Sequence, residues 1–143
     1  MYRRILVALD HTKADESLLP HVATLASLTH AELLLVHVAD GWAARNYDRL
    51  KLAESEEMRE DRAYLERTAA DLRERHGLAV ESRLALGDPP REILRLSQES
   101  QCDLIAMTTH GHRLIGDILF GSTIDYVRHR SKTPLLIVSP NKG

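Results

Sequence analysis

The sequence predicts an α/β domain built on a mainly parallel sheet. Five short apolar runs alternate with segments whose apolar residues follow helical spacing, a pattern typical of repeated strand–helix–strand units. The chain of 143 residues is long enough to bury its own core. No repeat, linker or change of composition divides it, so we expect a single domain over residues 1–143. The five apolar runs are Ile5–Leu9, Leu33–Val38, Val80–Leu86, Leu104–Met107 and Leu135–Val138.

Helical patterns occupy the connections between these runs. Apolar residues recur at helical spacing within Leu18–Ala26, and again as a stripe inside the charged run Glu54–Arg75, which is interpreted as a solvated helix face without catalytic function. Pro89 and Pro90 suit the first turn of a third helix, and a fourth is expected over Ser122–Arg130. The stripe within the charged run consists of Met58, Leu65, Ala69 and Leu72.

Charge and composition exclude several classes of function. Nineteen basic residues against 21 acidic ones give a formal net charge of -2, so no basic excess favours a nucleic acid or an anionic membrane as partner. There is no apolar run near the roughly 18 residues of a membrane span and no signal-peptide pattern. The single cysteine, Cys102, has no partner for an internal disulfide. We therefore expect a cytoplasmic protein.

Candidate binding residues follow the predicted strands, where ligands bind in doubly wound sheets. Asp10 follows the first run and suits a ribose hydroxyl; taken alone, such a carboxylate is more often an N-cap or turn residue for the next helix. The backbone of Val38 is placed to pair with the edge of a base. The Thr108–Gly111 turn and the later Gly121–Thr123 segment combine glycines with hydroxyls, as a phosphate cradle requires. The alternative is a left-handed turn at Gly111 followed by a capped helix.

Other site types have less support. Neither the P-loop nor the dinucleotide-binding glycine pattern is present, which argues against a kinase or a dehydrogenase. His110 and His112 form the closest histidine pair but have no further ligand at familiar spacing, so no metal site is expected. Ser122 lies outside a nucleophile elbow, and no catalytic residue is assigned. His37 is interpreted as a hydrogen-bonded core residue, and His129 as a partner for a helix C-terminus.

These residues together resemble the universal stress protein family over Met1–Pro140. The resemblance depends on Asp10 at a strand end, on the spacing from Gly111 to Gly121–Ser122 with nine intervening residues, and on the succession of five predicted strands along the chain. The ATP-binding branch of that family carries the pattern G-x2-G-x9-G-[S/T]. In this chain Thr108 stands in place of the first glycine, whereas the phosphate-facing half of the pattern is intact.

The resemblance implies an open, Rossmann-like sheet of five parallel strands in the order 3-2-1-4-5, with helices on both faces, of the adenine nucleotide alpha hydrolase-like type. It further implies a dimeric stress-response sensor or regulator that binds ATP or AMP, with or without Mg²⁺, between the first and fourth strands. Two copies would pair through the edge strand Leu135–Val138. The nucleotide-binding residues that it implies are Ala8, Leu9, Asp10, Val38, Met107, Thr108, Thr109, His110, Gly111, Gly121, Ser122 and Thr123.

Two alternative functions stay open at this stage. In a ligand-free dimeric adaptor, the side chain of Thr108 would close the pocket. In a slow ATP-hydrolysing enzyme, Asp10 would be the strand-end acid beside Mg²⁺ and a positioned water. We expect ATPase activity that is weak at most.

Overall fold

The computed structural model describes residues 1–39, 56–109 and 123–140. Its centre is a five-stranded sheet in the order β3-β2-β1-β4-β5, and each neighbouring pair of strands is parallel. This order confirms the fold class and places the reversal of strand order between β1 and β4. The strands are β1 (Arg4–Ala8), β2 (Glu32–Ala39), β3 (Val80–Leu86), β4 (Leu104–Thr108) and β5 (Leu135–Val138).

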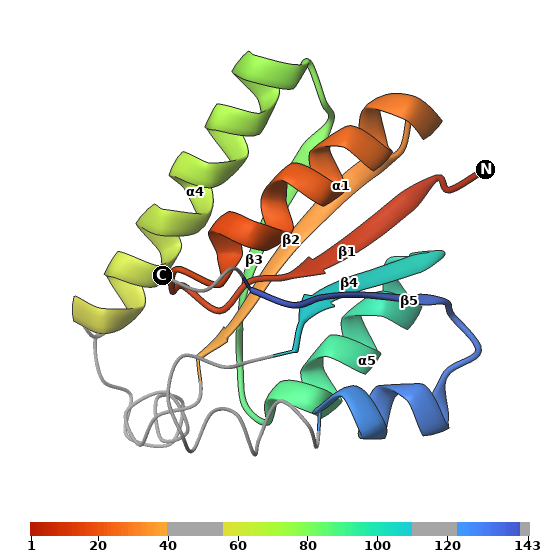
Figure 1. Ribbon diagram of the computed structural model, residues 1–143. Helices are drawn as coiled ribbons and strands as arrows, with labels where there is room; N and C mark the ends of the chain where they lie inside the picture. Colours follow the sequence, from red (N-terminus) through yellow and green to blue (C-terminus); the bar gives the residue numbers. More distant parts are fainter. Residues whose placement is uncertain (40–55, 110–122, 141–143) are drawn as a thin grey trace.

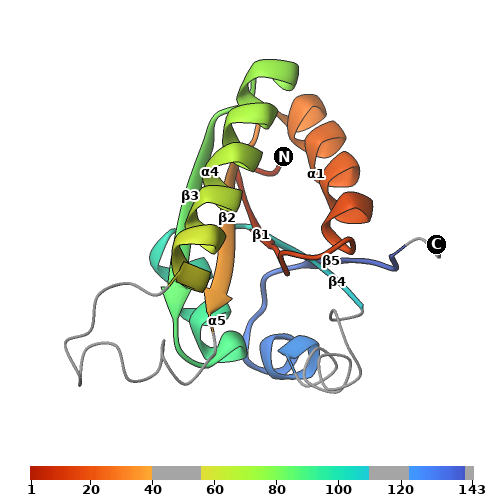
Figure 2. The ribbon, with the colours of Figure 1, turned by 90° about the vertical axis from the view of Figure 1, so that its left-hand side faces the viewer.

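Helices cover both faces of this sheet (Figure 1; Figure 2). On one face lie α1 (Asp15–Thr29) and α4 (Glu56–His76); on the other lie α5 (Pro89–Glu99) and the helical residues 123–130. Alternate side chains of β1 supply both layers of the core. Ile5 and Val7 pack with α1 and α4, whereas Leu6 packs on the face of α5, as the two-residue repeat of a strand requires.

Local signals set the helix boundaries. Pro89 and Pro90 occupy the first turn of α5, where a missing backbone N–H costs nothing. α4 ends at His76, and Gly77 follows with a φ of 64°, a left-handed conformation in which glycine carries no steric penalty. Along the solvent face of α4, Arg75 pairs with Asp71 at 2.8 Å.

Thr108 differs from its predicted place. The sequence predicts Thr108 at the start of a turn, but it is the last residue of β4, where it is paired with Val138 of β5 and is 1% exposed. A β-branched side chain suits a buried strand better than a tight turn. The strand therefore extends one residue further than its apolar run.

Among the described residues, none of the helices combines the length and the apolar character needed to cross a bilayer.

Candidate functional site at the carboxyl ends of the strands

The turn after β1 is fixed by a buried carboxylate. The backbone N–H groups of Asp10 and His11 donate to the two oxygens of Asp15, each at 2.8 Å, and Asp15 is 1% exposed. The hydroxyl of Thr12 donates to Oδ2 of Asp10 at 3.1 Å. The turn thus holds Asp10 at the carboxyl end of β1, where the strand order reverses.

The structure excludes one of the two structural roles considered for Asp10, that of an N-cap. The N-cap of α1 is Ala14, which caps without a side-chain hydrogen bond, so Asp10 is not the N-cap of this helix. Its carboxylate instead accepts a hydrogen bond inside the turn.

The buried carboxylate of Asp15 accepts the hydrogen bonds that hold this turn together. Burial raises its pKa, and the opposing contributions are hydrogen bonds from the backbone of Asp10, the hydroxyl of Tyr64 and the backbone of His11. The Tyr64 hydroxyl donates to Oδ2 of Asp15 at 2.6 Å. Burial, followed by the nearby negative charge of Asp15, raises the pKa of Tyr64. A tyrosine of α4 therefore ties that helix to the start of α1.

A second buried carboxylate, Asp61 of α4, lies between two histidines. Its Oδ1 is 2.6 Å from Nδ1 of His11, and its Oδ2 is 3.5 Å from Nε2 of His37. The ring of His11 also stacks on Tyr64, with 4.1 Å between the ring centroids. We call His11, His37 and Asp61 the histidine–carboxylate cluster. It joins the turn after β1, the end of β2 and the first turns of α4.

A buried hydroxyl, that of Thr109, follows the carboxyl end of β4. The backbone N–H of Thr109 donates to the carbonyl of Val138 at 3.1 Å, which fixes this residue against β5. Its Oγ1 is buried and has no hydrogen-bond partner among the residues that the structure describes. Buried polar atoms are rarely left without a partner. A ligand with hydroxyl or phosphate oxygens at this edge would supply one.

The other predicted site residues fall into two groups. Ala8, Leu9 and Met107 are buried at the ends of β1 and β4, and the structure brings these ends together as sheet neighbours. Val38, in β2, packs on the face of α5. Thr123 is buried where the helical residues 123–130 begin. His110, Gly111, Gly121 and Ser122 lie outside the described residues.

Sequence reasoning missed Asp61, Tyr64 and Asp15. The interpretation of Glu54–Arg75 as only a solvated face is wrong at Asp61, which is 6% exposed. The buried residues of α4 are Met58, Asp61, Leu65, Ala69 and Leu72, so Asp61 occupies the one position at which the apolar stripe was interrupted. An acid at a core position of an amphipathic helix is the signal that could have identified it.

The interpretation of two histidines is confirmed. Nδ1 of His37 lies 2.9 Å from the carbonyl oxygen of Leu9, so this ring is hydrogen-bonded at the edge of the core. Nδ1 of His129 lies 2.7 Å from the carbonyl oxygen of Asp125, one helical turn earlier. In the part of the chain that is described, no group of three or more histidine, cysteine or acidic side chains is arranged to hold a metal ion.

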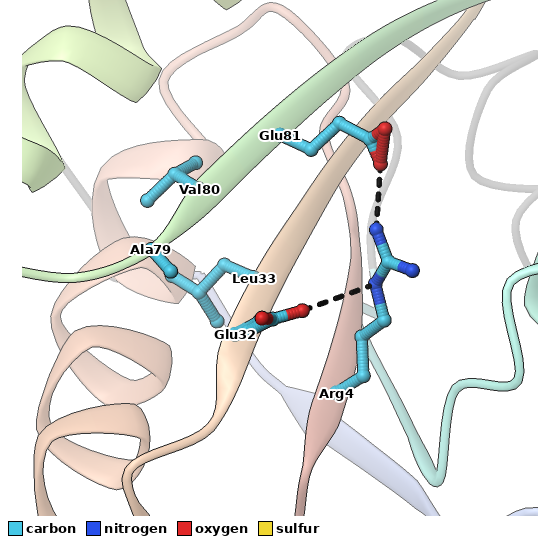
Figure 3. Close-up of a pocket in the computed structure, with 6 residues that line it drawn as sticks. All are labelled: Arg4, Glu32, Leu33, Ala79, Val80 and Glu81. Atoms are coloured by element: carbon cyan, nitrogen blue, oxygen red, sulfur yellow. Dashed lines mark hydrogen bonds and ion pairs between the residues drawn. The ribbon is translucent and has the colours of Figure 1, made fainter.

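A hollow of about 240 Å³ lies at the amino ends of β1, β2 and β3, opposite to the carboxyl ends described above, and is a weaker candidate for a binding site (Figure 3). Arg4 projects beside it and pairs with Glu81 at 2.6 Å and with Glu32 at 3.9 Å. Two carboxylates already balance this guanidinium, so it offers no uncompensated positive charge to a ligand. The lining residues are Arg4, Glu32, Leu33, Ala79, Val80 and Glu81.

Comparison with known proteins identifies relatives over nearly the whole chain. The sequence profile described as "Universal stress protein family" matches residues 1–139. Universal stress protein MJ0577 of Methanocaldococcus jannaschii is 26% identical, with 96% of this chain and 95% of the relative aligned.

Solved structures show the same fold. The structure of protein MJ0577 matches with a TM-score of 0.76 and 25% identity, covering 100% of this chain and 99% of that one. A universal stress protein solved in complex with cAMP matches with a TM-score of 0.68 and 25% identity over 96% of this chain and 97% of its own. The universal stress protein of Archaeoglobus fulgidus in complex with dAMP has a TM-score of 0.70 at 22% identity, covering 96% and 98%.

Proposed function

The chain belongs to the universal stress protein family, and we propose that it binds an adenine nucleotide, ATP or AMP, at the carboxyl ends of β1, β2 and β4. The observation that carries this proposal is the buried hydroxyl of Thr109, which has no hydrogen-bond partner among the described residues and lies at the end of β4, the neighbour of β1 at the reversal of strand order. A relative of the same fold has been solved with cAMP, so the family fold accommodates an adenine nucleotide.

The proposed contacts follow from the position of each residue. Asp10, held by the turn after β1, accepts a hydrogen bond from a ribose hydroxyl. The backbone of Val38 pairs with the base edge, and the hydroxyl of Thr109 donates to a ribose or phosphate oxygen. The sequence segments around Gly111 and Gly121–Thr123 complete the phosphate side, with Mg²⁺ as an accompanying ion when the ligand is ATP.

We propose that the output is regulation rather than turnover. Nucleotide occupancy would change the order of the site and thereby the surface offered to partners in a stress response. The acting form would be a cytoplasmic homodimer paired through Leu135–Val138. Buried Thr108 belongs to β4, which gives no support to a pocket closed by its side chain.

Calorimetry of the purified chain with ATP and AMP tests the binding proposal. Asp10→Ala should weaken binding by about tenfold or more, which corresponds to about 1.4 kcal/mol. Thr109→Val should also weaken binding, yet it should leave the free protein as stable or slightly more stable, since it removes, at nearly constant volume, a buried hydroxyl that has no partner in the described part of the chain. These two opposite effects distinguish a ligand contact from a structural role.

Two control variants accompany this experiment. Thr24→Val, on the exposed side of α1, and Asp71→Asn, on the solvent face of α4, should bind as the wild type does. Absence of ATP and AMP binding in the folded wild-type protein would favour the ligand-free adaptor. Rapid release of ADP from ATP would favour the enzyme.

A further inference from the structure

In the histidine–carboxylate cluster, the contacts of His37 determine which ring nitrogen carries its proton. Nδ1 of His37 lies 2.9 Å from the carbonyl oxygen of Leu9. A carbonyl oxygen only accepts hydrogen bonds, so Nδ1 carries a proton. In neutral His37, Nε2 then carries no proton, and its lone pair faces Oδ2 of Asp61 at 3.5 Å. Only the doubly protonated ring donates a hydrogen bond to this carboxylate.

His11 does not share this dependence. Its Nδ1 lies 2.6 Å from Oδ1 of Asp61, and a proton on Nδ1 is compatible with both the neutral and the charged ring. His11 itself has a φ of 60°, a left-handed conformation that is uncommon for a residue other than glycine. Asp61 therefore helps to hold a strained turn in either charge state of His11, whereas its contact with His37 depends on one proton.

The neighbouring charges are mainly acidic. The turn after β1 contributes Asp10, and the start of α1 contributes Asp15 and Glu16. From α4, Tyr64 stacks on His11 and donates its hydroxyl to Asp15.

The remaining neighbours complete this electrostatic picture. On β3 the residue in register with His37 is the apolar Leu84. Along α4 the basic residues nearest to Asp61 are Arg59 and Arg62, and both are exposed. A proton on His37 thus lowers the negative charge of a predominantly acidic edge of the sheet.

We propose that Asp61 is a positioning residue for the nucleotide site and that one proton on His37 couples nucleotide affinity to pH. This inference rests on the proposed function. The protonated pair ties the end of β2, next to Val38, to α4, and through His11 it ties both to the turn that carries Asp10. It also adds one positive charge close to a ligand that carries phosphate. Both effects strengthen binding as pH falls through the range in which histidine gains its proton.

Calorimetry with AMP at about pH 6 and about pH 8 tests this coupling. The wild-type chain should bind AMP roughly tenfold more tightly at the lower pH, with uptake of a proton. In Asp61→Asn and in His37→Gln the pH dependence should shrink to that of the AMP phosphate itself. The phosphate of AMP titrates equally in every experiment, so the difference between wild type and variant is the measured quantity.

The matched control is Asp71→Asn, an equivalent change on the solvent face of the same helix. It should keep the full pH dependence of the wild type. Circular dichroism checks that each variant is folded, and His37→Gln provides the test if Asp61→Asn does not fold, since glutamine donates a hydrogen bond without titrating.

A measurement without ligand tests the proton arrangement directly. Nitrogen-15 NMR of the imidazole rings should show that neutral His37 carries its proton on Nδ1. A neutral ring protonated on Nε2 would overturn the inference. Equal pH dependence in wild type, Asp61→Asn and His37→Gln would overturn the coupling alone, whereas a lack of AMP and ATP binding at either pH would overturn the proposed function together with it.

Discussion

At the scale of single residues, Cys102 shows how burial controls reactivity. The side chain packs in the same cluster as buried residues of α5 and β4 and is 7% exposed. Burial raises the pKa of its thiol from 9.0 to about 11, which lowers the thiolate population roughly a hundredfold at neutral pH. The only cysteine of the chain is therefore poorly suited to act as a nucleophile or redox sensor.

We predict slow modification of Cys102 in the folded protein. At about pH 8 a chromogenic disulfide reagent should react at least tenfold more slowly than with the urea-unfolded chain, because the reactive form is the thiolate. The absorbance of the released thiol measures both rates. Equal rates before and after unfolding would show that the thiol is accessible and ionised in the native state.

At the scale of elements, the residue that ends α1 has a strained backbone conformation that a substitution could relieve. The helix ends at Thr29, and His30 follows with a φ of 61°; its N–H donates to the carbonyl of Ala26. This left-handed position is usually occupied by glycine, because a Cβ atom is disfavoured there. The His30 side chain is exposed, and no contact of its ring with another described side chain would be lost on substitution.

We predict that His30→Gly stabilises the protein. The free energy of unfolding should rise by roughly 0.5–1 kcal/mol, since relief of strain exceeds the entropy that glycine adds to the unfolded chain. Urea denaturation followed by circular dichroism measures this change. His30→Ala is the control and should not raise the free energy of unfolding, because alanine keeps the Cβ atom. An equal increase in both variants would show that the effect comes from loss of the imidazole and not from relief of backbone strain.

At the scale of the whole molecule, β5 is an edge of the described sheet. The carbonyl oxygens of Pro134 and Val138 accept hydrogen bonds from the backbone of Ile105 in β4 and of Thr109 just after it. Alternate residues of a strand direct their backbone groups to opposite sides, so the N–H and C=O of Leu135 and Ile137 point to the open edge. Val138 is 8% exposed and packs in the core with α1 and α4. A substitution at Ile137 therefore tests the proposed dimer more directly than one at Val138.

We predict that Ile137→Pro converts the proposed homodimer to a monomer. Proline removes an outward backbone donor that β4 does not use. Light scattering should show a dimer for the wild type and for the control Ile137→Val, and a monomer for Ile137→Pro, which should still bind nucleotide. A wild-type protein that is monomeric at micromolar concentration, or a proline variant that stays dimeric, would place the interface elsewhere.

The sequence by itself determined most of the framework. The apolar runs predicted β3 and β5 to the residue and the other strands to within one residue at each end. Pro89, Pro90 and Gly77 marked helix boundaries, because their backbone preferences act locally. The order of the strands came from the resemblance to a family, and the location of the proposed site at Asp10 and the end of β4 followed from that order.

Only the tertiary structure revealed what surrounds that site. In the sequence Asp61 is one more acid in a charged run. Its proposed role depends on the packing of α4 against β2, which places the carboxylate against His37. The same packing brings Tyr64 to Asp15, and the pairing of β4 with β5 leaves the hydroxyl of Thr109 buried without a partner among the described residues. Propensity and periodicity are properties of neighbouring residues, whereas burial, tautomer and hydrogen-bond partners depend on segments that meet only in the folded chain.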